Sequence, residues 1–415
     1  MRTDASMDND TSHNLTHASQ EALEHLQQQG LRRSLRRVLS TSGAEIALPQ
    51  RDSVINFSSN DYLGLATSEA LKEAMREGVD RFGVGSGASR LVCGNYAPHE
   101  DLEAALASYK GAEAALAFTS GYATAVGTIP ALVGPGDVVI LDKLSHASLI
   151  DAAKLSGATI RIFPHNHLGK LERLLAGARE KGGASTRVLV VTESIFSMDG
   201  DAAPLAEIIA LKEKHGAWLL VDEAHAVGVL GPQGRGLVAS LGLEKQVELQ
   251  MGTLSKAIGV SGGYVATSSA VRDLLINRAR SLIYSTAPPP AVAWTAKHAI
   301  SLLQSAEGEA RREKLWANKR LLLSLLGGTF TAQTNALPAA ILPIIIGDEE
   351  AAVQTSAALL EAGHLIPAIR YPTVSRGAAR LRLTLSAIHE AGQIEALVAC
   401  LRRMVPQLGI ATHGA

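Results

Sequence analysis

Cysteine is scarce in this chain, and uninterrupted runs of hydrophobic or like-charged residues are missing. The two cysteines, Cys93 and Cys400, cannot build a disulfide framework, and neither lies in a CxxC motif or a Cys/His cluster. We therefore predict a reducing, cytoplasmic location and no metal site. The stretch 115–134 comes nearest to a membrane span, but three glycines and a proline interrupt it, which favours a soluble core.

Composition describes a soluble globular protein, with 47% hydrophobic and 19% charged residues. The net charge of −1 and the lack of a charged block give no reason to expect nucleic acid or a membrane surface as a partner. The first 20 residues lack the apolar segment of a secretory signal. A chain of 415 residues is too long for one typical hydrophobic core, so we expect two domains together with terminal segments. These are a disordered tail at 1–18, an N-terminal arm at 19–55, a large domain at 56–290 and a smaller α+β domain at 291–415.

From about residue 115 onward, short apolar runs alternate with helical patterns. The runs predict strands at 115–118, 136–141, 158–163, 187–192, 218–221 and 262–267. Strands that alternate with helices of ten or more residues indicate a mostly parallel sheet covered on both faces. The predicted fold class is therefore α/β.

Polar side chains follow several of these predicted strands, at the edge of a parallel sheet where ligands bind. Asp222 and His225 come directly after the Trp218–Val221 run, and Lys256 lies in a small-residue turn 34 residues beyond Asp222. Pyridoxal phosphate requires a lysine for its Schiff base and a carboxylate to keep its pyridine nitrogen protonated. The alternative is a surface lysine beside a solvated acidic loop.

Glycine-rich segments were weighed as nucleotide or nucleophile motifs. The segment Gly83–Arg90 has neither the GxGxxG spacing nor a Walker lysine, which excludes nucleotide binding of either type. The segment Gly259–Gly263 matches GxSxG, but its predicted strand follows the serine instead of preceding it, so this match is accidental. The turn before Gly121 and Tyr122 offers free amides at a helix N-terminus, which suits a phosphate group.

Four arginines gather near the C-terminal end, around the segment Tyr371–Thr373: Arg370, Arg376, Arg380 and Arg382. Guanidinium groups pair carboxylates in a bidentate manner, so the cluster could clamp a carboxylate substrate. A solvated strand edge is the alternative, and the residues alone favour that alternative.

Six ordered segments give a more specific signal than any single motif, and together they resemble the α-oxoamine synthase family of pyridoxal-phosphate enzymes. They are Phe57–Leu65, Leu144–Leu149, Phe196–Asp201, Asp222–His225, Thr253–Lys256 and Ala368–Val374. The similarity extends from about residue 19 to 404. It implies fold type I, like aspartate aminotransferase, with an N-terminal helical arm and a smaller C-terminal α+β domain.

The resemblance also implies roles for individual residues. Lys256 would carry pyridoxal 5′-phosphate as a Schiff base, and Asp222 would pair the pyridinium nitrogen. His225 would hydrogen-bond the phenolate oxygen of the cofactor, and His146 would stack on its ring.

Residues implied for the rest of the cofactor are Ser197, Thr253, Gly121 and Tyr122, together with Ser285 and Thr286, which would reach the neighbouring phosphate across a homodimer interface. Residues implied for the acyl substrate are Arg33, His146, Arg370 and Thr373. Either Arg33 or Arg370 could clamp a distant carboxylate, and the sequence ranks neither above the other.

The implied activity is that of a C-acyltransferase of biotin synthesis, joining L-alanine to a pimeloyl thioester of CoA or of a carrier protein. Arg370 and the segment Met198–Gly200 argue for this branch. The alternatives within the family are 2-amino-3-ketobutyrate ligase, 5-aminolevulinate synthase and a serine palmitoyltransferase-like enzyme. A catalytically inactive subunit would be expected to lack the lysine, and Lys256 is present.

Overall fold

A seven-stranded sheet with the order β3-β9-β8-β7-β6-β4-β5 forms the centre of the computed structural model, which describes residues 14–182, 185–327 and 338–408. Its strands are β3 (Ala114–Phe118), β4 (Val138–Asp142), β5 (Thr159–Phe163), β6 (Val188–Glu193), β7 (Trp218–Asp222), β8 (Leu249–Thr253) and β9 (Gly263–Thr267). The strands from β8 to β5 pair in parallel, whereas β9 is antiparallel to both β3 and β8. The predicted α/β class and the mostly parallel sheet are confirmed.

Helices bury both faces of this sheet, which explains why its strands are continuous apolar runs. Successive residues of β6 face opposite sides: Leu189 packs in one cluster with Ile129 and Leu149, whereas Val190 packs in another with Leu171 and Ile208. The helices on the first side are α4 (Gly121–Leu132), α5 (Ala147–Ser156), α9 (Ser269–Arg278) and α10 (Arg280–Ile283), and those on the other are α6 (Leu168–Gly182), α7 (Leu205–Lys214) and α8 (Leu237–Ser240).

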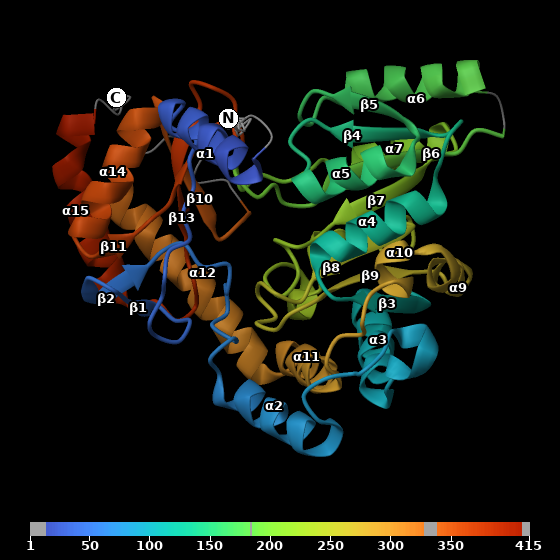
Figure 1. Cartoon of the computed structure of the whole chain (residues 1–415), viewed down its shortest axis with the longest axis horizontal. Helices are drawn as coiled ribbons and strands as arrows, with labels where there is room; N and C mark the ends of the chain where they lie inside the picture. The colour runs from blue at the N-terminus through green and yellow to red at the C-terminus, as the bar shows by residue number, and fades with distance from the viewer. Residues whose placement is uncertain (1–13, 183–184, 328–337, 409–415) are drawn as a thin grey trace, which may run out of the picture.

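Three helices pack together beside β3, at the lower edge of Figure 1. They are α2 (Glu69–Phe82), α3 (Ala97–Lys110) and α11 (Pro290–Leu303). Gly78 allows the closest approach, because a Cβ atom there would lie 2.9 Å from the Cα atom of Ala291. The 21-residue helix α12 (Ala306–Leu326) then leads into the C-terminal part.

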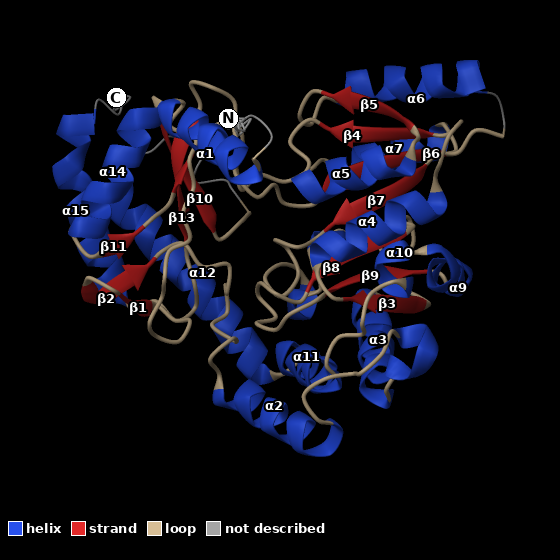
Figure 2. Cartoon of the chain, in the orientation of Figure 1, coloured by secondary structure: helices blue, strands red, loops and turns tan. Residues whose placement is uncertain are grey.

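The C-terminal part contains two three-stranded sheets, which Figure 2 shows as a group separate from the large sheet. One has the order β10-β13-β12, from β10 (Ile341–Gly347), β13 (Ala379–Thr384) and β12 (Ala368–Ile369). The other joins β1 (Glu45–Leu48), β2 (Arg51–Asn56) and β11 (His364–Leu365), so residues of the predicted N-terminal arm share a sheet with residue 364. Helices α14 (Glu349–Glu361) and α15 (Ala391–Leu408) complete this part. The proposed domain boundaries stay a prediction.

Helix α1 (Leu15–Gln28) corrects the predicted disordered tail, since residues 15–18 are helical. The side chain of Asn14 accepts a hydrogen bond from the Thr16 amide at 2.9 Å, which caps the helix N-terminus despite the polar composition of the segment. Residues 1–13 lie outside the described residues. Gly30 has φ +66°, and residues 31–39, which belong to the expected N-terminal helical arm, are irregular and largely exposed. Within the described ranges, no helix has both the length and the apolar character needed to cross a membrane.

A fully buried ion pair supports the loop that follows β7. Lys110, at the end of α3, donates to Glu223, and both side chains are completely inaccessible to solvent. Glu223 also accepts from the Val238 amide at 2.9 Å. Because Glu223 is the neighbour of Asp222, this pair fixes the backbone at the centre of the predicted site.

We expect Lys110→Met to lower the free energy of unfolding by about 3–5 kcal/mol, because it leaves the Glu223 carboxylate buried and unpaired. Urea denaturation of the purified protein measures this loss. The matched control is Lys72→Met, which removes an exposed pair with Glu69 and should cost under about 1 kcal/mol. Equal losses in the two variants would contradict a structural role for the buried pair.

Candidate active site

The parallel register brings the ends of three central strands to one edge of the sheet. Glu193, the last residue of β6, pairs with Asp222, the last residue of β7, and Asp222 pairs with Met251 of β8. A cavity of about 250 Å³ opens at this edge. Its lining residues are Ser120, Gly121, Tyr122, His146, Ser148, Glu193, Asp222, Ala224, His225, Met251, Gly252, Thr253, Ser255 and Lys256. Residues from five separate segments of the chain therefore meet here.

Lys256 contributes the only amine to this lining. The Lys256 Nζ atom lies 2.8 Å from Nε2 of His225. Burial lowers the pKa of Lys256 to about 8, although the nearby carboxylates of Asp222 and Glu193 act in the opposite direction. The lowered pKa makes the Lys256 amine much easier to deprotonate near neutral pH than an ordinary lysine.

Asp222 and His225 are both buried, with exposed fractions of 6% each. The Asp222 Oδ1 atom accepts a hydrogen bond from the Ala224 amide at 2.9 Å. Burial raises the pKa of Asp222, and the positive charge of Lys256 opposes this rise. Burial, together with the charge of Lys256, lowers the pKa of His225 well below its usual value, so the imidazole is neutral.

His146 and Glu193 contact each other in the lining of the cavity. The His146 amide donates to Glu193 Oε1 at 2.6 Å, and the His146 ring nitrogen Nδ1 lies 2.8 Å from the hydroxyl of Ser148. Burial and the neighbouring charge of Asp222 raise the pKa of Glu193 to about 8. We did not predict Glu193 as a site residue, although its position directly after a predicted strand was a usable signal.

The N-terminus of α4 forms an anion-binding corner of the cavity. Ser120 caps this helix by accepting from the Ala123 amide at 3.0 Å, which leaves the first-turn amides of Gly121 and Tyr122 without helical partners. A Cβ atom on Gly121 would lie 3.6 Å from the Cβ atom of Thr253, so these two residues form adjoining walls. An amine, a buried acid, a neutral histidine and a phosphate corner in one cavity fit pyridoxal phosphate.

Six of the predicted site residues are not among those that line the cavity: Ser197, Ser285, Thr286, Arg33, Arg370 and Thr373. Ser285 and Thr286 lie in a segment that forms an isolated bridge with Ser89. Arg370 donates to the carbonyl oxygen of Gly30, which joins the C-terminal part to the N-terminal arm. Arg33 and Thr373 are exposed. The roles of these six residues stay predictions.

Two arginines of β13 reach toward the cavity from the C-terminal part. Arg380 and Arg382 are buried, with exposed fractions of 7% and 5%, so they do not form a solvated strand edge. Arg380 pairs with Asp199, whereas Arg382 donates to the carbonyl oxygen of Ser197 at 2.7 Å. Arg382 also donates to Asn60 Oδ1 at 3.1 Å and to the Thr384 hydroxyl at 3.2 Å. Its positive charge contributes to the lowered pKa of both Lys256 and His225.

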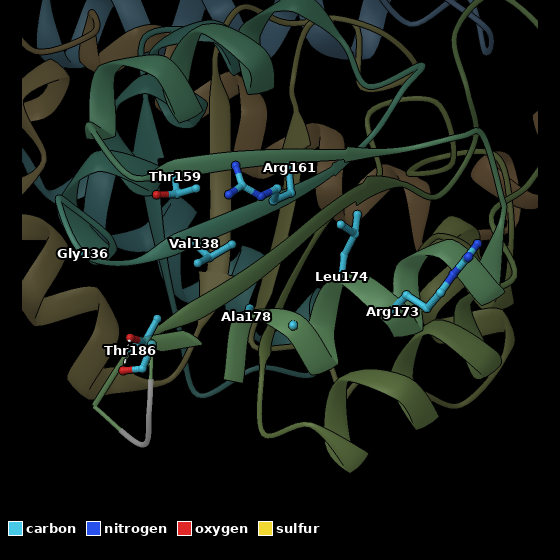
Figure 3. Close-up of a pocket in the computed structure, with 10 residues that line it drawn as sticks. Gly136, Val138, Thr159, Arg161, Arg173, Leu174, Ala178 and Thr186 are labelled. Atoms are coloured by element: carbon cyan, nitrogen blue, oxygen red, sulfur yellow. Dashed lines mark hydrogen bonds between the residues drawn. The ribbon is translucent and has the colours of Figure 1, made fainter. Parts of the chain in front are cut away.

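A larger cavity, of about 340 Å³, lies away from this site beside β4, β5 and α6 (Figure 3). Its charged lining residues are Arg161 and Arg173, which are both exposed, and it has no acid, histidine or lysine in its lining. Chemistry is therefore assigned to the cavity around Lys256. Among the residues placed by the structure, no cluster of three or more His, Cys, Asp or Glu side chains has the geometry of a metal site.

The sequence of this chain is similar to those of known enzymes over nearly its whole length. The family model for aminotransferases of class I and II matches residues 52–401. An 8-amino-7-oxononanoate synthase from Geobacter sulfurreducens is 47% identical over 392 residues, which cover 94% of this chain and 98% of that protein.

Solved structures also resemble the fold of this chain over most of its length. A serine palmitoyltransferase from S. paucimobilis, solved with a bound pyridoxal-phosphate adduct of myriocin, has a TM-score of 0.86 and 30% identity, covering 97% of this chain and 100% of that one. An 8-amino-7-oxononanoate synthase from Francisella tularensis has a TM-score of 0.72 and 28% identity, covering 85% of this chain and 98% of that one.

The buried Glu193 carboxyl predicts a specific pH dependence of stability. Its pKa in the folded protein is about 8, above its usual value of 4.5, so the unfolded chain releases this proton first. The contribution of Glu193 to stability is therefore complete below about pH 4.5 and is lost as the pH rises to about 8.

The side chain of Glu193→Gln is neutral at every pH. We therefore expect the free energy of unfolding of this variant, relative to that of the wild type, to rise by at least about 1 kcal/mol between pH 5 and pH 8.5. Urea denaturation of both proteins across this range measures the difference. Glu73→Gln is the control, because Glu73 is exposed and forms a surface ion pair with Arg76. Parallel stability curves for wild type and Glu193→Gln would contradict the assignment of a neutral, buried Glu193.

Proposed function

Because this chain belongs to the class I and II aminotransferase family, and within it to the 8-amino-7-oxononanoate synthases, we propose that it condenses L-alanine with a pimeloyl thioester. Its cofactor is pyridoxal phosphate. The products are 8-amino-7-oxononanoate, CO2 and the free thiol. The observation that carries this proposal is the convergence of Lys256, Asp222 and His225 in one cavity.

When bound, the cofactor supplies an electron sink for the carbanion that forms at the alanine Cα atom. Lys256 provides the amine that holds the cofactor, and its lowered pKa allows that amine to take the α-proton once it is neutral. Asp222 holds a proton on the pyridine nitrogen, because a carboxylate beside a cation favours the charged pair. The first-turn amides of Gly121 and Tyr122 bind the phosphate.

The proposed condensation forms one carbon–carbon bond and breaks a thioester bond and a carbon–carboxylate bond. The alanine Cα atom loses a proton and forms a carbon–carbon bond to the thioester carbonyl, and the thiol leaves. The carboxylate of alanine then departs as CO2, and a proton returns to Cα. Lys256 is placed to move both protons, and His146, which also lines the cavity, would stack on the cofactor ring and limit access of water.

Arg382 is the best-placed residue to bind the carboxylate of alanine. Its positive charge acts on Lys256 and His225, and its hydrogen bonds to Ser197, Asn60 and Thr384 all go to uncharged oxygens. Arg380, by contrast, is already paired with Asp199. A guanidinium group that is buried and not neutralised by an acid favours an incoming carboxylate.

The far carboxylate of the pimeloyl chain requires a second cation, since an unpaired carboxylate loses hydration on entering a pocket. Arg370 and Arg33 remain the two candidates. Arg370 contacts the arm that carries Arg33, through the carbonyl oxygen of Gly30. The two residues therefore belong to one region of the surface, and Thr373 lies in the turn that follows Arg370.

A homodimer is proposed for this chain on the basis of exposed hydrophobic side chains. The Ser89–Thr286 bridge joins two segments that expose Val84, Val92 and Tyr284 to fractions of 78%, 78% and 72%. Large hydrophobic side chains exposed to this extent on paired segments are typical of a surface that a partner buries. Ser285 and Thr286 would then approach the phosphate of the other subunit, and analytical ultracentrifugation distinguishes the dimer from a monomer.

The serine palmitoyltransferase alternative has the support of structural similarity alone. The sequence identity of 30% to that enzyme is lower than the 47% identity to the 8-amino-7-oxononanoate synthase. A product assay with alanine, glycine and serine against several acyl-CoA thioesters decides between the two substrate classes.

We expect Lys256→Ala to fold but to lose all turnover and the visible absorption of the lysine-bound cofactor. Borohydride reduction of the wild type, followed by peptide mapping, should find the pyridoxyl label on Lys256. The exposed Lys245 offers a control, because Lys245→Ala should retain both the absorption and the label. A label on any other lysine would overturn the assignment.

We expect Arg370→Ala to raise KM for pimeloyl-CoA ten- to a hundredfold more than KM for a methyl-ended acyl-CoA of similar length. A charge-assisted hydrogen bond contributes roughly 1.5–3 kcal/mol, which corresponds to that range. Arg376→Ala is the matched control, because Arg376 is close in sequence to Arg370 and stacks on Tyr371, with its Cζ atom 4.3 Å from the ring centroid. Equal losses with both thioesters would mean that Arg370 holds the CoA or the fold instead.

A further inference from the structure

Tyr62, in the loop between β2 and α2, contacts His225, which in turn contacts Lys256. Its side chain is buried, with 1% exposed. Its hydroxyl lies 2.6 Å from Nδ1 of His225, on the opposite side of that ring from the Lys256 amine at 2.8 Å from Nε2. The three side chains therefore form a continuous line of hydrogen-bonding atoms.

The neutral imidazole of His225 carries one proton, and its partner on Nδ1 decides which nitrogen holds it. If the Tyr62 hydroxyl donates to Nδ1, then Nε2 holds the proton and points it toward Lys256. If the hydroxyl accepts from Nδ1, then Nε2 is bare and accepts a hydrogen bond from Lys256.

The surroundings of Tyr62 favour donation to His225. The competing acceptor, Asn60 Oδ1, lies 3.3 Å from the hydroxyl, which is longer than the 2.6 Å to His225. Asn60 Oδ1 also already accepts from Arg382 at 3.1 Å. Burial raises the pKa of Tyr62 to about 12, so the phenol keeps its proton as a donor throughout the working range.

We propose that Tyr62 is a positioning residue that fixes the tautomer of His225, donating to Nδ1 so that Nε2–H faces the cavity beside Lys256. This inference rests on the proposed function only in assigning the cavity to the cofactor. A donor facing Nζ cannot accept a proton from a lysine ammonium, so this tautomer favours the neutral amine that proton transfer requires. When pyridoxal phosphate is bound, the same N–H is available to an oxygen of the cofactor.

The test compares Tyr62→Phe with Tyr264→Phe. Tyr264 is an equally buried tyrosine whose hydroxyl has no hydrogen-bond partner among the residues that the structure describes. Its substitution removes the same atom from the core without removing a hydrogen bond. Circular dichroism confirms that both variants fold.

The first readout is the tautomer of His225 in the cofactor-free protein, from NMR spectra of ¹⁵N-histidine-labelled samples. The signal is assigned by its loss in His225→Gln. We expect an Nε2–H tautomer in the wild type and in Tyr264→Phe, and a mixed or Nδ1–H population in Tyr62→Phe. An Nδ1–H tautomer in the wild type would overturn the proposal without any variant.

The second readout is the pH midpoint at which the visible cofactor band of the holoenzyme titrates. We expect Tyr62→Phe to move this midpoint by about one pH unit, a tenfold change that corresponds to about 1.4 kcal/mol, and Tyr264→Phe to leave it in place. An unchanged tautomer and midpoint in Tyr62→Phe would reduce Tyr62 to a packing residue. Neither readout uses the acyl substrate, so a failure of the proposed condensation would be detected separately.

Discussion

Parallel pairing of β6, β7 and β8 is the constraint on which the rest of this site depends. The register sets Glu193 opposite Asp222, and both carboxyl groups end at the same edge of the sheet as Thr253. Helices on both faces exclude water from the strands, so the side chains at this edge are the first polar groups beyond a dry core. Their chemistry follows from that burial.

Burial of several ionisable groups together explains the electrostatics of the cavity. Two carboxyl groups on paired strands cannot both carry charge at low cost in a poorly hydrated space, and the pKa values of Glu193 and Asp222 are both raised by burial. The charge of Lys256 opposes the rise for both groups and favours the carboxylate form. Lys256, in turn, loses part of its affinity for a proton. The site thus combines one negative charge, one readily neutralised amine and a neutral imidazole.

The C-terminal part completes the site through two buried arginines. Arg380 and Arg382 lie on β13 and hold the segment 197–199 of the large-sheet part by an ion pair and a hydrogen bond. Arg382 also reaches Asn60, which precedes Tyr62. Segments near residues 60, 198 and 382 are therefore fixed relative to one another by the same two side chains, and any movement between the two parts must alter these contacts.

The sequence by itself determined the α/β class, six of the seven strands of the large sheet and the identity of the principal residues. Continuous apolar runs marked six of these strands, and Asp222 and His225 followed one of them directly. The strand β8, which precedes Lys256, was not among the predicted strands. Six ordered segments identified the family and its cofactor, and the accidental GxSxG match was recognised because β9 begins after Ser261.

Only the tertiary structure decided which polar groups meet. The burial of Arg380 and Arg382 was invisible to the sequence, since their alternating pattern also fits an exposed edge and burial depends on the loop at 197–199 that covers them. The sequence signalled only the position of Glu193 after a predicted strand, and its pairing with Asp222 arises from the strand register. Tyr62 gave no signal, because its role arises from a contact with His225 across 163 residues. The helix at residues 15–18 likewise depended on a side-chain cap that composition does not reveal. Local pattern determines the elements, whereas contacts between distant segments determine charge and proton position.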